Sequence, residues 1–498
     1  MLFNSIEFLI FFPIVCLFYF VLPYKVQYVY LLLCSYFFYM CWNPKYALLM
    51  FTSTAITYLS GILIDRCDKI SDEQSRTRWK NLFVMLSFAS NLSILFFFKY
   101  FNFVTDAVVR LLSLVNIQVA VPTFDVILPV GISFYTFQAL SYTMDVYRKD
   151  IYAERNFLKY ALFVSFFPQL VAGPIERSKN LLVQVNERHT FDFERMKRGL
   201  LLMLFGYFQK VVLSSYLSMV VDNVYNNYQD RTGSQLIIAT VCFAFQIYCD
   251  FGGYSNIAIG AAQVMGFRIM ENFNTPYFSK SVSEFWRRWH ISLSTWFRDY
   301  LYIPLGGNRK GKRRKHFNLM VVFILSGLWH GAKWHFVAWG GINGIFQVIG
   351  ENLMPVKKRL YQLLKIDENN FFVKCYKTVI TFILIDFSWI FFRAESFKKS
   401  LKIIRRMIKF WSPGWIAHGD NLPDLGLDQS TLQVLLVSLA ILFISDILKY
   451  KNFQVREWIC SRKLPLRWAI CYLAIMFVLI FGVYGPGYNS AEFIYFQF

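Results

Sequence analysis

The chain of 498 residues is strongly apolar: hydrophobic residues make up 56% of it and charged residues only 17%. A soluble domain averages about 25% charged residues, and a soluble fold could not bury so many long apolar stretches. The composition therefore excludes an ordinary soluble enzyme and predicts an all-α polytopic membrane protein. The net charge of +21 does not indicate nucleic-acid binding, because the basic residues lie between apolar runs, as in membrane proteins.

Thirteen apolar stretches along the chain are candidate transmembrane or re-entrant helices. The first is not a secretory signal, because it contains Glu7 and lacks both a basic leading region and a small-residue cleavage site. Several others are shorter than the ~20 residues that a straight span needs, and we expect these to be tilted, re-entrant or buried. The stretches are 5–23, 27–43, 46–64, 81–101, 157–172, 199–221, 235–249, 254–267, 317–331, 334–350, 376–393, 431–448 and 467–484.

Two basic loops predict the orientation. Loop 65–80 is rich in lysine and arginine, and six of the seven residues 309–315 are lysine or arginine, so both are expected in the cytoplasm. Three candidate spans precede the first loop, which places the N-terminus outside.

The second loop resembles a phosphate loop, but Arg313 follows Lys312 where that motif needs serine or threonine, which excludes an NTPase.

The chain shows no internal repeat and no linker, which predicts one membrane domain, 1–498. Its parts are N-terminal helices at 1–101, a catalytic core at 127–350 and C-terminal helices at 371–498. Within the core, the stretch 127–148 contains Pro129, Gly131 and many hydroxyl groups. We expect it to line something polar rather than to face lipid.

The stretch 285–316 contains the most informative pattern. A helix up to about residue 301 would place Arg287, His290, Ser294 and Arg298 on one face and tryptophans on the other. An interfacial helix that extends its arginines toward lipid headgroups would show the same pattern. Two arginines and a histidine on one face would also suit a ligand that carries phosphate.

His330 lies in "SGLWHGAKWH" (326–335), fifteen residues after the basic loop. If the intervening charge-free run is helical, its rise of about 22 Å places His330 deep in the hydrocarbon region. An ionisable residue at that depth is a functional candidate, although a neutral histidine bonded to Ser326 is the simpler alternative.

His330 and His335 lie off the i, i+4 spacing and have no nearby cysteine or carboxylate, so we predict no metal site. The chain has no G-x-S-x-G element, but a buried histidine without one can still act as a general base that deprotonates a substrate hydroxyl.

Seven stretches together resemble the membrane-bound O-acyltransferase family, and most of all its bacterial alginate O-acetyltransferase membrane subunits. The resemblance covers nearly the whole chain and departs from the family at Asn256, where relatives often have aspartate, so no catalytic role is assigned to that position. The stretches are "MLFNSIEFLIFFPIV", "LPVGISFYTFQALSYTMDVYR" (128–148), "FPQLVAGPIER" (167–177), "YCDFGGYSNIAIG" (248–260), "FWRRWHISLSTWFRDYLYIPLGG" (285–307), "SGLWHGAKWHFVAWGGING" (326–344) and "EFIYFQF".

The resemblance implies roughly 11–13 helices around a central funnel in a bacterial inner membrane. It implies that His330 is the catalytic base and that His290 is a second functional histidine, nearer the cytoplasmic mouth. Acetyl-coenzyme A would donate the acyl group, with no bound cofactor, to a polysaccharide hydroxyl or to a periplasmic acetyltransferase partner. We expect Arg287, Arg298, Ser294, Trp286 and Trp329 to bind the donor or to pack the funnel, and His335 to be structural.

Three alternatives stay open on the sequence alone. D-alanyl transfer to teichoic acid shares the family core. A transporter or flippase of an acyl or glycan intermediate would need no chemistry, although such proteins usually contain paired repeats that are not found in this sequence. A scaffold subunit of an envelope complex would not need His330. The acceptor polymer and the oligomeric state are not specified by any residue pattern.

Overall fold

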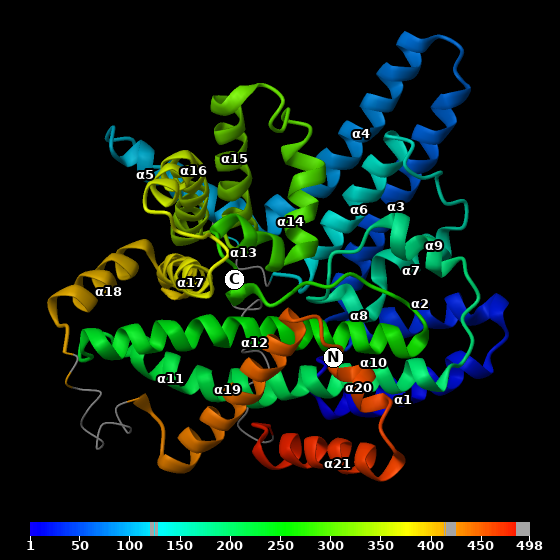
Figure 1. The fold of residues 1–498 in the computed structure, drawn as a ribbon. Helices are drawn as coiled ribbons and strands as arrows, with labels where there is room; N and C mark the ends of the chain where they lie inside the picture. The colour runs from blue at the N-terminus through cyan, green and yellow to red at the C-terminus, as the bar shows by residue number, and fades with distance from the viewer. Residues whose placement is uncertain (120–123, 125–127, 413, 415–424, 485–498) are drawn as a thin grey trace. The chain divides into compact units, whose positions relative to one another are not determined.

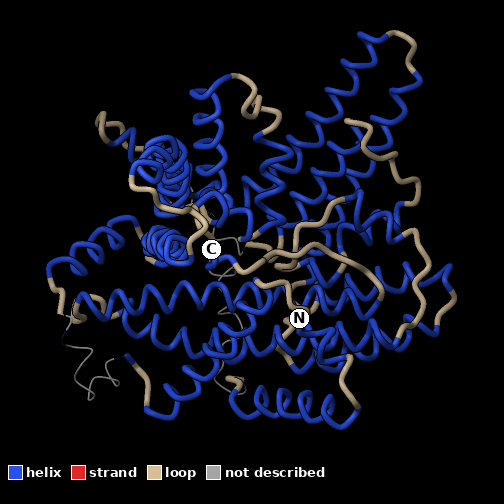
Figure 2. Tube along the Cα trace, viewed as in Figure 1, coloured by secondary structure: helices blue, strands red, loops and turns tan. Residues whose placement is uncertain are grey.

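The computed structural model describes residues 1–119, 124, 128–412, 414 and 425–484. These residues form α-helices joined by loops, with no β-strand among them (Figures 1 and 2). The ending "EFIYFQF" lies outside the described residues. The helices form two compact units, one of Met1–Met203 with Ile257–Met270 and one of Leu204–Asn256 with Glu271–Phe498. We call these the first and the second unit.

The first unit contains the N-terminal helices. Four of them begin after an N-cap residue whose short polar side chain accepts a hydrogen bond from a backbone nitrogen of the first turn. These residues are Ser5, Asn43, Asp72 and Asn156. Its helix α6 is almost wholly buried, as expected of a helix that does not face lipid. The helices are α1 Ile6–Val21, α2 Tyr24–Met40, α3 Pro44–Arg66, α4 Glu73–Leu95, α5 Phe101–Ser113, α6 Ile132–Tyr147, α7 Phe157–Ser165, α8 Phe167–Leu170 and α9 Val183–Val185.

The second unit contains both candidate histidines. Two helices, α10 Phe193–Tyr207 and α12 Gly233–Met265, have residues in both units. The others are α11 Ser215–Asn226, α13 Val282–Arg288, α14 Ile291–Phe297, α15 Gly311–His330, α16 Trp334–Leu363, α17 Phe371–Arg393, α18 Phe397–Lys409, α19 Gln429–Tyr450, α20 Val455–Cys460 and α21 Leu464–Phe481. A π-helical segment, Phe208–Ser214, joins α10 to α11, and another, Arg298–Tyr302, follows α14.

Two predicted spans, 235–249 and 254–267, are one helix, α12. The Gly252–Gly253 pair between them does not break the helix. A Cβ at Gly253 would lie 2.7 Å from the carbonyl oxygen of Gly206 and 3.0 Å from the backbone nitrogen of Lys210. Glycine at this position allows the neighbouring backbone to approach closely, a role that the sequence pattern could not distinguish from a break.

Helices α15 and α16 form a tight antiparallel pair that positions His330. A Cβ at Gly327 would overlap the carbonyl oxygen of Phe336, and one at Gly340 would overlap the carbonyl oxygen of Phe323. Small residues of this kind let two helix backbones approach closely within a membrane. His330 is the last residue of α15, and the Phe336 ring fills the space beside the extended Gly331 that follows it.

Seven of the described helical stretches are long and apolar enough to cross a membrane, which confirms an all-helical, multi-pass membrane protein. Helix α1 is apolar but has only 16 residues. The total of roughly 11–13 transmembrane or re-entrant helices, and their arrangement around a funnel, stay predictions. The seven stretches are Pro44–Lys69, Glu73–Ser113, Phe193–Asn226, Gly233–Met265, Phe371–Arg393, Gln429–Tyr450 and Leu464–Phe481.

Candidate functional site

His290 and His330 lie side by side inside the second unit. Their ring centroids are 6.3 Å apart, and the two residues are only 1% and 4% exposed. This spacing is too long for a direct hydrogen bond between ring nitrogens, but one oxygen atom could lie within hydrogen-bonding distance of both rings. The fold therefore brings together two buried histidines that are forty residues apart in sequence.

The predicted helix 285–301 is wrong, and this changes the position of His290. The chain forms α13 and α14 with a break at Trp289 and His290, where His290 takes a left-handed backbone conformation with φ 43° and ψ 54°. Such a conformation is uncommon for a residue with a side chain and often marks a functional site. Because of the break, the histidine is buried beside His330 instead of lying on a basic helix face.

Aromatic rings surround both imidazoles. The His330 ring has Trp329, Trp339 and Phe392 as neighbours, with centroids at 5.0, 5.1 and 5.3 Å and near-perpendicular planes. The His290 ring lies 4.7 Å from Phe251 and 5.8 Å from Trp329. Such surroundings have few groups that stabilise a charge, so they favour neutral imidazole.

Burial lowers the pKa of His290 to about 3. The imidazole is therefore neutral at neutral pH, with a nitrogen lone pair that can accept a proton or a hydrogen bond. A histidine in this state is suited to orient a hydroxyl group and is poorly suited to bind an anion through its own charge.

Asn272 fixes the backbone that follows His290. Its carbonyl oxygen accepts a hydrogen bond from the nitrogen of Ile291 at 3.0 Å, and its side-chain oxygen accepts one from the Ser292 hydroxyl at 2.7 Å. Its amide group donates to the Ser255 hydroxyl on α12 at 3.1 Å. Asn272, Ser255 and Ser292 are all buried, so these bonds connect the start of α14 firmly to α12.

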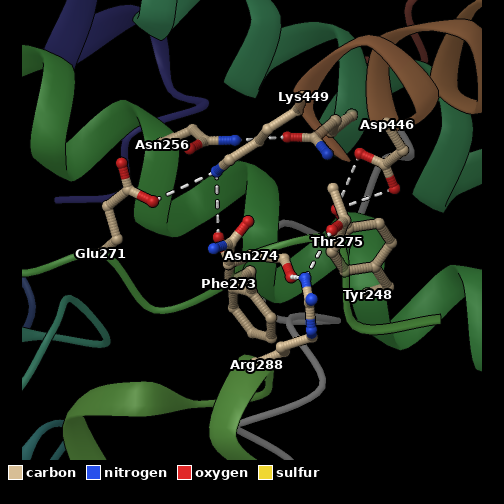
Figure 3. A network of polar contacts seen from close by, with 10 residues as sticks. Tyr248, Asn256, Glu271, Phe273, Asn274, Thr275, Arg288, Asp446 and Lys449 are labelled. Atoms are coloured by element: carbon tan, nitrogen blue, oxygen red, sulfur yellow. Dashed lines mark hydrogen bonds and ion pairs between the residues drawn. The ribbon is translucent and has the colours of Figure 1, made fainter. Parts of the chain in front are cut away.

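Helix α19 holds the chain segment that leads to His290 (Figure 3). The Tyr248 hydroxyl on α12 donates to both carboxylate oxygens of Asp446, at 3.2 and 3.1 Å. One turn further along α19, the Lys449 amine donates to the Glu271 carboxylate and to the carbonyl oxygen of Phe273, each at 3.2 Å. The end of α19 is thus bonded both to α12 and to the start of the segment 271–289.

Arg288 holds the same segment from its other end. Its guanidinium contacts the Glu284 carboxylate at 2.9 Å and donates to the carbonyl oxygen of Asn274 at 3.2 Å and to the Thr275 hydroxyl at 3.1 Å. Thr275 has φ 43°, which is strained for a β-branched residue. Side-chain bonds therefore stabilise two left-handed residues, Thr275 and His290, within sixteen positions of one another.

The structure separates the predicted donor-binding residues. Arg287 and Arg298 are exposed, and the Arg298 guanidinium lies 2.8 Å from the carboxylate of Asp299, so the predicted shared basic face does not exist. Trp329 lies against both histidines, and Trp286 packs on Trp339 with ring centroids 5.5 Å apart. The Ser294 hydroxyl donates to the carbonyl oxygen of Trp289 at 3.3 Å.

Two other positions have structural partners. His335 is buried, and its Nδ1 lies 3.0 Å from the carbonyl oxygen of Phe391, which supports a structural role. Asn256 donates to the side-chain oxygen of Gln209 at 2.7 Å. Among the residues that the structure describes, no three or more His, Cys, Asp or Glu side chains are grouped as metal ligands would be.

Lys210 and Asp250 form a second buried polar feature of this unit. The amine and the carboxylate are 2.6 Å apart, and their side chains are 4% and 6% exposed. Asp250 directly precedes Phe251, whose ring contacts His290. An ion pair inside a membrane domain is costly to bury, so its presence on the same helix as Phe251 is consistent with a functional role for this part of α12.

In the first unit, Glu176 of the "GPIER" stretch is fully buried. Its carboxylate accepts hydrogen bonds from the backbone nitrogen of Met270 and, at 2.6 Å, from the side chain of Asn180. Burial raises the pKa of Glu176 to about 7. Glu176 fixes the chain after α12, directly before the segment 271–289.

The sequence pattern missed several residues of the site. Phe251, Trp339 and Phe392 contact the histidines, yet aromatic residues are so frequent in this chain that no spacing distinguishes them. Asn272 lies in a loop with no recognisable motif. Only "KWHFVAW", which contains Trp339, lies close enough to His330 in sequence to have suggested a contact.

The chain is similar in sequence to several known proteins. The family model described as "MBOAT, membrane-bound O-acyltransferase family" matches residues 148–392, which include both histidines. A "Probable alginate O-acetylase AlgI" of Pseudomonas putida is 37% identical over 455 residues, which cover 91% of this chain and 89% of that protein. A "Peptidoglycan O-acetyltransferase" of Helicobacter pylori is 32% identical over 76% of this chain and 73% of its own length. A "Teichoic acid D-alanyltransferase" of Bacillus subtilis is 27% identical over 55% of this chain and 71% of its own length.

Proposed function

The chain belongs to the membrane-bound O-acyltransferase family and is an O-acyltransferase, and we propose that it transfers an acetyl group with His330 as general base. The donor is acetyl-coenzyme A from the cytoplasm. The acceptor is a hydroxyl group outside the cytoplasm, carried by a polysaccharide or by a periplasmic partner enzyme. The observation that carries this proposal is the pair of buried imidazoles, 6.3 Å apart, inside the family-matched region.

The chemistry needs one proton acceptor at the point where donor and acceptor meet. His330 takes the proton of the acceptor hydroxyl while that oxygen attacks the thioester carbonyl carbon. The new carbon–oxygen bond forms, the carbon–sulfur bond breaks, and the imidazolium gives the proton to the departing thiolate. His290 is close enough to hold the same hydroxyl oxygen and to orient it for attack.

The relatives favour an acetyl donor over a D-alanyl donor. The alginate and peptidoglycan O-acetyltransferases align over 91% and 76% of this chain, whereas the Bacillus subtilis D-alanyltransferase aligns over 55% at lower identity. Arg287 and Arg298 are exposed and are suited to the phosphates of coenzyme A at the solvent side of the donor path. Trp286, Trp329 and Ser294 would shape the inner end of that path.

For the orientation, we propose a bacterial inner membrane with the N-terminus outside. The basic segments 65–80 and 309–315 support cytoplasmic positions, although both were predicted as loops and are largely helical, since α4 begins at Glu73 and α15 at Gly311. With the donor on that side, the acetyl group would cross the membrane through the two-histidine site before it reaches the acceptor or a partner.

The test is acetyl transfer in purified membranes with labelled acetyl-coenzyme A. Release of free coenzyme A and label in the macromolecular fraction are both measured for His330→Ala, His290→Ala and the matched control His335→Ala. We expect a loss of about 10²- to 10⁴-fold for His330→Ala and at least tenfold for His290→Ala. The control, which removes an equally buried histidine, should stay near wild type per folded molecule. Full transfer by folded His330→Ala would overturn the mechanism.

A further inference from the structure

Helix α18 packs on the second unit through one narrow stripe. It begins after the N-cap Ser396, and its buried residues are Ser400, Ile403 and Met407, spaced three and four apart. Lys399 contacts Glu395 at 3.0 Å, and the Arg406 guanidinium donates to the carbonyl oxygen of Arg231 at 2.6 Å. These contacts fix the rotation of the helix about its own axis.

Next to the buried stripe, α18 exposes an apolar stripe. Phe397, Leu401 and Ile408 are 41%, 48% and 76% exposed, although they are large hydrophobic side chains. They are spaced four and seven apart, so they lie on one face of the helix. The following residues Phe410 and Trp411 are 45% and 55% exposed. This face is suited to lipid acyl chains rather than to water.

On the other side of the apolar stripe, α18 exposes a basic stripe. Lys398, Lys402 and Arg405 are exposed, and the helix contains no acidic residue. No ion pair of these three side chains is found within the part of the chain that the structure describes. Lys399 and Arg406, which do have partners, lie on the side toward the protein.

We propose that α18 lies at the bilayer surface and binds anionic phospholipid headgroups with Lys398, Lys402 and Arg405. Adjacent apolar and basic stripes on one exposed helix are the pattern of interfacial helices that bind anionic membranes. The apolar stripe enters the acyl region, and the three cations then lie at headgroup level. The positive charge excludes a basic partner. The segment 309–315 is also basic, but it contains no large apolar residue and so has no apolar stripe of its own. This inference does not depend on the proposed acyl transfer.

The test uses the full-length protein in neutral detergent micelles and phosphatidylglycerol labelled on its acyl chain. In the variant Lys398→Glu/Lys402→Glu/Arg405→Glu, we expect the dissociation constant to rise at least tenfold, because each basic side chain near an anionic surface contributes roughly fivefold. The matched control Lys310→Glu/Lys312→Glu/Arg313→Glu changes the net charge equally and should change the constant less than twofold. Leu401→Ser/Ile408→Ser should weaken binding while it keeps every charge.

Three results would overturn the proposal. The first is unchanged binding in the α18 charge variant at an unchanged melting temperature. The second is an equal loss in the control, which would mean a general effect of net charge. The third is complete displacement of the lipid by millimolar inorganic phosphate, which would mean a site for the phosphate ion alone. Labelled phosphatidylcholine, which is zwitterionic with no net charge, serves as the neutral probe and should bind wild type and the two charge variants alike.

Discussion

The buried ion pair of Lys210 and Asp250 makes a strong prediction about stability. Its atoms are 2.6 Å apart and its side chains are 4% and 6% exposed, so each charge is almost fully removed from solvent. Removing one partner of such a pair costs about 3–5 kcal/mol, because the other charge stays buried without it. We therefore expect Lys210→Met and Asp250→Leu each to lower the free energy of unfolding by about that amount.

The double variant Lys210→Met/Asp250→Leu should regain most of this loss, because it removes both charges and fills the space with apolar side chains. The matched control is Glu271→Gln, which breaks the pair of Glu271 with Lys449. That pair is 45% and 58% exposed, so the control should cost no more than about 1 kcal/mol. Denaturant unfolding of the full-length protein in detergent micelles measures all four variants, and acetyl transfer is measured in parallel.

Since Asp250 precedes Phe251, which contacts His290, transfer should fall in both single variants and recover in part in the double variant. Additive losses in the double variant would contradict the reasoning, because they would mean that the two charges do not stabilise each other. An equal cost for the exposed control pair would contradict it as well.

Three further predictions concern packing, pH and the segment before His290. Gly327→Ala should lower the free energy of unfolding by about 1–3 kcal/mol, because its Cβ would overlap the facing helix. The control Gly341→Ala has nothing within 4 Å of its Cβ, so it should be neutral or slightly stabilising. Denaturant unfolding measures both variants. Burial raises the pKa of Glu176 from its ordinary 4.5 to about 7, so its contribution to stability is full below about pH 4.5 and is lost as the pH rises through about 7. Melting temperatures of wild type should show this decline, and those of Glu176→Gln should not. Asp446→Asn should lower kcat for acetyl transfer more than it changes KM for the donor, and a change in KM alone would contradict a positioning role.

The sequence predicted an all-helical membrane protein, and the structure confirms this class, whereas the catalytic role of His330 stays a prediction. Apolar runs predict membrane helices because a bilayer requires about twenty apolar residues per span, and N-cap residues mark where many of them begin. The charge-free run before His330 predicts a helix that ends near this histidine, and α15 ends at His330.

The errors have a common physical origin. The 3.6-residue period continues through Trp289 and His290, so the pattern 285–301 reads as one helix. The break comes from long-range bonds of Asn272 to Ile291 and Ser292, which periodicity within the stretch cannot report. The same limit applies to Gly252 and Gly253, because a glycine pair that ends a helix and one that allows close packing look alike in sequence.

The segment before His290 is also bonded to a part of the chain that the family match does not include. The matched region ends at residue 392, whereas α19 begins at Gln429. Yet Asp446 and Lys449 of α19 bond to Tyr248 and to the start of the segment 271–289. The C-terminal helix therefore adds contacts to the segment before His290, beside the bonds of Asn272 that lie inside the matched region. Relatives that share the motifs but differ in this helix should differ in how they orient the acceptor hydroxyl, even where both histidines are present.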